Sequence, residues 1–120
     1  MPHIVFDQKI NLDDFSKKFI PVFQKEPFLI KVSSIFVEQK NSTALLPALV
    51  ISELRQQYFI EIFTNESKTT IRLYPGTDPK KTEGVKKSMA LVAKQIMKIY
   101  PNFHLIQTNL SEYLGVEIKI

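Results

Sequence analysis

The sequence predicts an α+β fold in which two β-α-β units form one sheet with two helices packed on one face. Two observations lead to this prediction. Segments rich in β-branched and aromatic residues alternate with helical patterns, and the resulting strand-helix-strand halves have similar lengths. Each helical pattern also carries one apolar stripe. The 120 residues are expected to form a single domain over 1–120, because a chain of this length supports one hydrophobic core.

The first half of the chain predicts a strand, a helix and a second strand. The apolar stretch at 3–6 contains β-branched residues and indicates a strand. Asn11 suits a helix N-cap, and an apolar face recurs over 12–25, which predicts a helix. We expect Pro21 to kink that helix, because proline removes a donor and crowds the preceding turn. The segment 28–38 is rich in Ile, Val and Phe and predicts a long second strand.

The middle of the chain predicts a connection followed by a hairpin. Residues 39–54 mix Asn, Ser, Thr and Pro with Leu, Ala and Val, and are interpreted as an apolar connection with about one helical turn. Residues 58–63 alternate well and predict a third strand. A turn at 65–68 and a hairpin partner at 69–74 are expected to follow.

A second helix is predicted after a break rich in proline and glycine. Thr77 or Asp78 is expected to cap it, Pro79 suits its first turn, and Pro101 ends it. Its apolar stripe consists of Val85, Met89, Val92, Ala93 and Ile96. This stripe is expected to pack on the sheet.

The end of the chain predicts two more strands. Residues 103–107 are expected to form a fourth strand, 111–115 a turn, and 116–120 a terminal apolar strand. We expect the terminal strand and the exposed strand edges to be covered by neighbouring subunits, since free apolar edges invite aggregation.

Composition excludes several kinds of chemistry. The chain has no cysteine, which excludes disulfides, thiolate nucleophiles and cysteine-ligated metals. His3 and His104 are its two histidines, which excludes a multi-histidine metal site in one chain. Its apolar runs are far shorter than the ~18 residues that a membrane span needs. The start of the chain has neither the basic residues nor the cleavage site of a signal peptide, so a cytoplasmic protein is expected.

The positive charge is concentrated in one segment. The net charge is +4, and between Pro79 and Lys98 six lysines stand against one acid, Glu83. A lysine face could bind phosphates without sequence preference, so a nucleic-acid or acidic-partner binding module is one hypothesis. The segment lacks arginine and interleaved aromatic residues, and a solvated helix face explains the same pattern. Nucleic acid is therefore not the favoured partner.

Pro2, directly before the first predicted strand, is the candidate catalytic residue. If the methionine is removed, a prolyl secondary amine is exposed. An α-amino group titrates near 7.7–8.0, and burial or a nearby cation lowers that pKa toward the range of a general base. The alternative interpretation is that Met-Pro is a common N-terminus with no functional meaning. If Met1 is retained, the nitrogen is an amide and has no basicity.

Met1-Pro2-His3 leading into a strand, followed by helix, strands, helix and strand in 120 residues, resembles the tautomerase superfamily. The layout is similar to that of the macrophage migration inhibitory factor-like and 5-carboxymethyl-2-hydroxymuconate isomerase-like members. It looks nearest to an uncharacterised branch that opens with Met-Pro-His and has a Tyr-rich turn like that at 111–115. The loop at 74–78 lacks the Gly-Arg pair common there, and the connection 39–55 is longer than in compact members.

The resemblance implies a site, a reaction and an assembly. Pro2 would be the base of a cofactor-independent keto-enol tautomerase acting on a 2-oxo or 2-hydroxydienoic acid. Lys25, Lys31 and Arg72 would bind the carboxylate of this small substrate. A homotrimer with pockets between neighbouring subunits would be expected.

Each candidate cation also has a simpler explanation. Lys25 suits a helix C-terminus, Lys31 suits an outward position of a strand, and Arg72 could pair with Glu61 across the hairpin. The alternatives to the enzyme are a non-catalytic trimeric interaction protein and the basic-face module described above.

Overall fold

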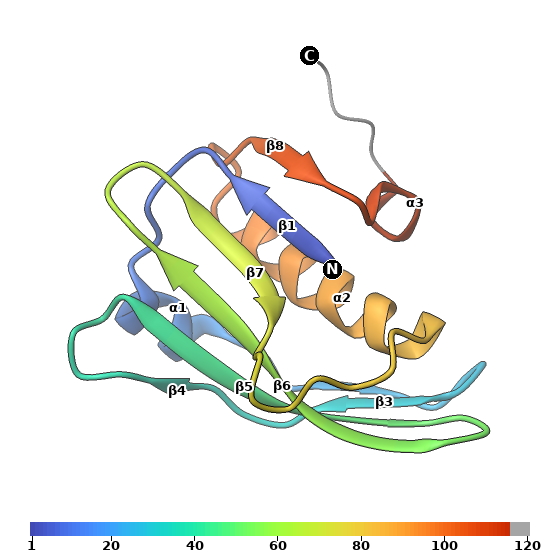
Figure 1. The fold of residues 1–120 in the computed structure, drawn as a ribbon. Coiled ribbons are helices and arrows are strands. Elements are labelled where there is room, and N and C mark those ends of the chain that lie inside the picture. Colours follow the sequence, from blue (N-terminus) through green and yellow to red (C-terminus); the bar gives the residue numbers. More distant parts are fainter. Residues whose placement is uncertain (116–120) are drawn as a thin grey trace.

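The computed structural model describes residues 1–115, which form an eight-stranded antiparallel sheet curled around one long helix (Figure 1). The strand order is β2-β3-β5-β6-β7-β1-β8, with β4 paired to β5. The elements are β1 (His3–Phe6), α1 (Leu12–Lys18), β2 (Val22–Gln24), β3 (Leu29–Val32), β4 (Phe36–Val37), β5 (Thr43–Ile51), β6 (Arg55–Thr64), β7 (Thr69–Leu73), α2 (Glu83–Ile99), β8 (Leu105–Thr108) and α3 (Ser111–Leu114).

The predicted pair of β-α-β units is wrong. A β-α-β unit joins neighbouring parallel strands, whereas the strand pairings in residues 1–115 are antiparallel. The helix α1 connects β1 to β2, yet four strands lie between them in the sheet. The helix α2 connects β7 to β8, and β1 lies between those two. The element types were largely predicted, but the way they pair was not.

The first helix is shorter than predicted. The expected N-cap is confirmed, since the Asn11 side chain accepts a hydrogen bond from the Asp14 N–H. The helix α1 ends at Lys18, and its expected second half over 19–25 is instead a turn followed by β2. Pro21 explains the difference, because its ring cannot continue the helix and the chain turns back as a strand beside β3.

The segment 39–54 was predicted wrongly as a connection, because most of it is the long central strand β5. The predicted strand 28–38 is present but interrupted, as β3 and β4. Both pieces pair with the same edge of β5, and three residues at 33–35 stand opposite two residues of β5. This irregularity is a β-bulge.

Pro47 lies in β5 at the position of that bulge. A proline has no N–H to donate, so it is normally confined to strand edges and bulges. The pairing of β5 with β3 stops at Ala48, and the pairing with β4 starts at Leu45. Pro47 is therefore tolerated in a central strand because the neighbouring strand is broken beside it.

The predicted hairpin is confirmed, as β6 and β7. The second helix is confirmed as α2 and all five predicted stripe residues are buried, but its N-cap is Thr82 rather than Thr77 or Asp78. The strand expected at 103–107 is β8, and the turn expected at 111–115 contains the short helix α3. The strand predicted at 116–120 lies outside the described residues.

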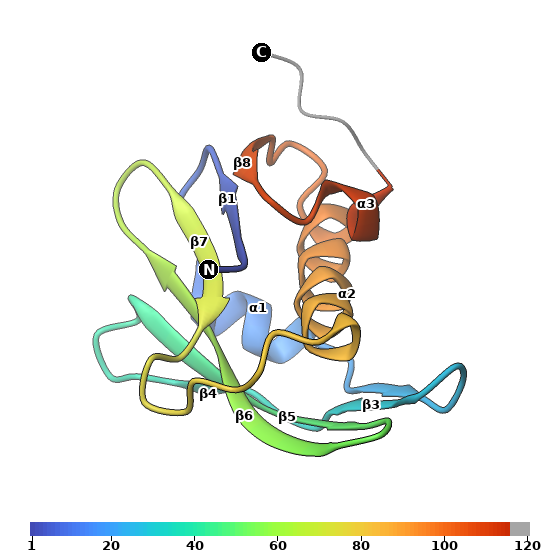
Figure 2. The same cartoon turned by 45° about the vertical axis from the view of Figure 1, so that its right-hand side comes forward.

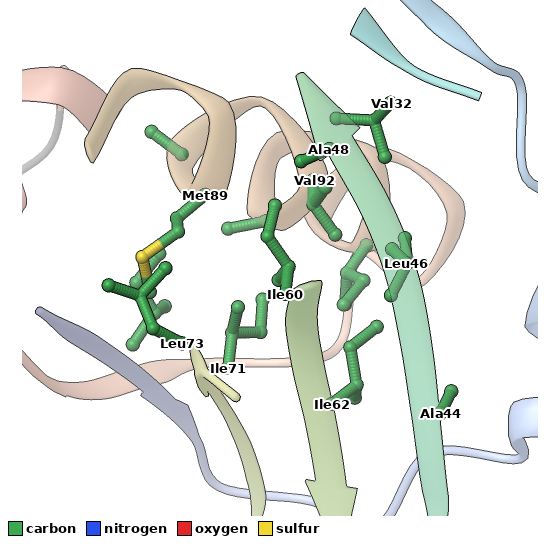
Figure 3. Close-up of a cluster of buried hydrophobic side chains, with 14 of the residues drawn as sticks. Val32, Ala44, Leu46, Ala48, Ile60, Ile62, Ile71, Leu73, Met89 and Val92 are labelled. Atoms are coloured by element: carbon green, nitrogen blue, oxygen red, sulfur yellow. The ribbon is translucent and has the colours of Figure 1, made fainter. Parts of the chain in front are cut away.

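The core fills the space between the inner face of the sheet and α2. Figure 3 shows side chains of β5, β6 and β7 pointing toward Met89 and Val92 of the helix. The helix packs closely on β5, since a Cβ on Gly84 would lie 2.4 Å from a methyl carbon of Val50. One polar pair lies in this layer, where the hydroxyls of Tyr58 and Ser88 are 2.5 Å apart. The interior side of the sheet is thus occupied by packed side chains.

Candidate functional site: the outer face of the sheet

The opposite side of the sheet is not covered by the helices of residues 1–115. All three helices of residues 1–115 lie on the inner side (Figure 2). Residues directly opposite each other on paired antiparallel strands share one face, so the strand register identifies the side chains of the outer face. This outer face is defined by residues 29, 31 and 36 of β3 and β4, by the odd positions of β5 and β6, by 70 and 72 of β7, and by Phe23 and His3 at its margins.

Aromatic side chains are the most conspicuous residues of the outer face. Phe23 is 57% exposed, Phe36 63% and Phe63 41%. Phe59 lies between them, half-buried, with its ring against Tyr74 at 6.3 Å between centroids. Phe23, Phe36 and Phe63 are among the eight large apolar side chains that are exposed in residues 1–115.

The strand β5 is apolar on both faces. Its inner residues Ala44, Leu46, Ala48 and Val50 are buried in the core, and its outer positions from 45 to 51 are Leu45, Pro47, Leu49 and Ile51. An antiparallel strand with one face in water normally alternates apolar and polar residues. A strand that is apolar throughout is typical of a sheet covered on both sides. The sequence of β5 therefore fits a sheet whose outer face is covered.

One ion pair lies within this apolar surface. Arg72 of β7 stands opposite Glu61 of β6, and its Nε donates to Oε1 at 2.5 Å. The predicted cross-strand pairing of these residues is confirmed. The Arg72 guanidinium also lies 6.0 Å from the Phe63 ring centroid, and Arg72 faces His3 on its other side. The pairing neutralises the nearly buried carboxylate of Glu61.

Two hollows indent the outer face on either side of Pro47. The first has a lining of mixed polarity that includes Lys31, Pro47 and Gln57. The second is mostly apolar, is lined by Phe36, Leu45 and Tyr74 among others, and has two carboxylate residues, Glu38 and Glu61. A cation therefore lines one hollow and carboxylates line the other.

Pro2 directly precedes β1 and is buried. The carbonyl of Met1, to which the proline nitrogen is bonded, accepts hydrogen bonds from His3 Nδ1 at 3.0 Å and from Asn109 Nδ2 at 2.8 Å. Asn109 also accepts the His3 N–H at 3.0 Å. The Met1–Pro2 peptide bond must be cut to free the proline amine, and its carbonyl oxygen accepts hydrogen bonds from two donors.

The predicted cations do not gather around Pro2 within one chain. Lys31 is on β3, four strand spacings or about 19 Å from β1. Lys25 follows β2, still farther across the sheet, and lies 5.8 Å from the Phe23 ring. Arg72 is on the neighbouring strand, but it is paired with Glu61. The roles proposed for these residues in catalysis stay predictions.

Three lysines of the lysine-rich segment, Lys87, Lys94 and Lys98, lie on one face of α2. Lys94 and Lys98 are exposed on α2, Lys86 and Lys87 are half-buried, and Lys80 precedes the helix. Within residues 1–115, no three His, Asp or Glu side chains gather as metal ligands would. No helix in that range is long and apolar enough to cross a membrane.

The outer face was missed in the sequence because 39–54 was interpreted as a connection. The signal that identifies it is the apolar character of both odd and even positions over Thr43–Ile51.

Comparisons with protein-family models, curated proteins and solved structures find no match for this chain.

Proposed function

We propose that this protein is a non-catalytic interaction protein that binds a protein surface through the outer face of its sheet. The observation that carries the proposal is the composition of β5, which is apolar on both faces although the helices of the described residues cover only one. Exposed Phe23, Phe36 and Phe63 support it, because aromatic residues are enriched at protein interfaces. Of the alternatives drawn from the sequence, this one agrees best with the arrangement of the outer face.

The proposal is tested by site-specific photo-crosslinking in the cell of origin. A benzophenone amino acid replaces Phe63 on the outer face in one strain, and Ile106 on β8 in a control strain. Ile106 is a matched control because it is 44% exposed, close to the 41% of Phe63, and lies on the edge strand. We expect a protein adduct from position 63 and none from position 106. No adduct at 63, or equal adducts at both positions, would overturn the proposal.

A further inference from the structure

We propose that the partner of the outer face is a second copy of this chain, related by a two-fold axis that runs across the strands over Pro47 and Phe59, midway between the two sheets. This inference rests on the proposed function and names its partner. In a two-fold dimer the same surface must fit itself, so each feature needs a complement elsewhere on that surface. The register of the sheet allows this requirement to be checked residue by residue.

About this axis β3 with β4, β5 and β6 overlap with their counterparts in the second copy. The strand β7 pairs with residues 60–64 of β6, on one side of Phe59, so β7 and β1 lie outside the overlap. The strands β5 and β6 have nine and ten residues, which gives a length of about 30 Å at ~3.4 Å per residue. The three overlapping strand positions, β3, β5 and β6, span about 14 Å at ~4.8 Å per strand. The flat overlap is on the order of 400 Å² per copy before the relief of the side chains is added. A standard interface buries about 800 Å² per partner.

A two-fold axis through Pro47 and Phe59, which pair with each other, reverses the strands of the second copy. Positions at equal distances on either side of the axis then face each other. On β5, two residues from Pro47 in each direction, Leu45 of one copy lies over Leu49 of the other. Apolar side chains thus meet from 45 to 49 of the central strand, and Thr43 of one copy lies over Ile51 of the other.

The same operation places cations over aromatic rings. Phe36 is opposite Leu45, and Lys31 is opposite Leu49, so Lys31 of one copy lies over Phe36 of the other. This places a lysine at the hollow that carries Glu38 and Glu61. On β6, Phe63 and Arg55 are equally far from Phe59 and also face each other. A cation over an aromatic face is favourable, and two such pairs occur twice in the dimer.

Cross-linking through single cysteines tests this geometry, since the chain has no native cysteine. The variants are Pro47→Cys on the axis, Leu45→Cys and Leu49→Cys on either side of it, and Ile106→Cys as an exposed control away from the face. The reagent is a short bis-maleimide that spans the facing Cβ atoms of sheets packed about 10 Å apart. Circular dichroism and light scattering on each variant confirm that it folds and report its mass.

We expect a dimer by light scattering, efficient linkage of Pro47→Cys with itself, and linkage of Leu45→Cys with Leu49→Cys in a mixture. Leu45→Cys alone, Leu49→Cys alone and Ile106→Cys should link at least tenfold less. A monomer at all concentrations, or a dimer that links equally at Leu45→Cys alone and in the mixture, would overturn the inference.

Different outcomes would contradict the second-copy inference and the proposed function. If position 63 gives an in-cell adduct whose mass differs from two chains, while the purified protein is monomeric, the outer face binds another protein and the second-copy inference is wrong. If position 63 gives no adduct, the proposed function itself is wrong.

Discussion

Tyr58 and Ser88 form a polar contact between the buried face of β6 and the buried face of α2, with their hydroxyl oxygens 2.5 Å apart. Ser88 also donates to the Val85 carbonyl at 2.6 Å, so its hydrogen is already used and Tyr58 must donate to Ser88. Burial raises the pKa of the Tyr58 hydroxyl, which keeps it protonated as a donor. This pair joins the helix to the sheet within the core.

The direction of that hydrogen bond predicts unequal effects of two substitutions. Ser88→Ala leaves the buried Tyr58 hydroxyl without an acceptor and should lower the free energy of unfolding by about 2 kcal/mol. Tyr58→Phe removes the donor and leaves Ser88 bonded to Val85, so the free energy of unfolding should fall by only about 1 kcal/mol. Urea unfolding of both variants measures the difference. A larger loss in Tyr58→Phe would mean that the hydrogen bond runs the other way.

The Arg72–Glu61 pair is expected to be coupled. The Arg72 side chain is 47% exposed and that of Glu61 only 8%, so Arg72→Met leaves a nearly buried carboxylate without its partner. Because Arg72 is partly screened by solvent, we expect the free energy of unfolding to fall by about 1 kcal/mol, which is less than for a fully buried ion pair. The double variant Arg72→Met/Glu61→Leu should recover most of it. A double-mutant cycle by urea unfolding checks this, and additive losses would show that the two side chains are independent.

Stability is expected to fall in acid through Asp7. The backbone N–H of His104 donates to the Asp7 carboxylate at 2.8 Å and lowers its pKa below the usual 3.8. A folded-state pKa below the unfolded one stabilises the fold above the unfolded value, and this contribution is lost as the pH falls through the folded value. The gap in urea midpoint between wild type and Asp7→Asn should therefore be constant from pH 7 to about 5 and shrink below about 4.

His104→Ala is the matched control for the acid experiment. It removes the ring contact at 3.0 Å but keeps the backbone N–H, which is the largest cause of the lowered pKa. The acid dependence should therefore largely remain in His104→Ala. Its complete loss in this variant would assign the effect to the imidazole instead.

Pro2 is expected to have no role in turnover. If the proposed function is correct, purified protein and its Pro2→Ala variant show the same background rate with 2-oxo acids. An intact mass of the purified protein accompanies the assay, because Pro2 has a free amine only if Met1 is removed. A rate that depends on Pro2 in protein lacking Met1 would restore the tautomerase hypothesis.

The local elements could be predicted better than their pairing. The apolar stripe of α2 and the alternation at 58–63 depend on neighbours in sequence, and both predictions are confirmed. The position of β1 between β7 and β8 depends on contacts across the chain, which periodicity does not report. The same limit applies to the fold class, because β-α-β units and this sheet share a similar order of elements.

The outer face could have been inferred from one segment. Thr43–Ile51 was interpreted as a connection because its apolar run lacks alternation and contains Pro47. The structure explains both features. The alternation is missing because one face of the strand packs in the core and the other belongs to the apolar outer face, and Pro47 is tolerated because a bulge lies beside it. By contrast, Lys25 and Lys31 were grouped with Pro2 through a fold that the chain does not have.

Sedimentation equilibrium of the wild type and of Leu49→Lys tests the central claim, that the outer face binds a second copy, most directly. Leu49 lies on that face, half-buried in the single chain, so a lysine there should alter the interface more than the fold. We expect twice the 13.9 kDa chain mass for the wild type and one chain mass for a folded Leu49→Lys. A wild type at 13.9 kDa over the whole concentration range, or an unchanged dimer in Leu49→Lys, would contradict it.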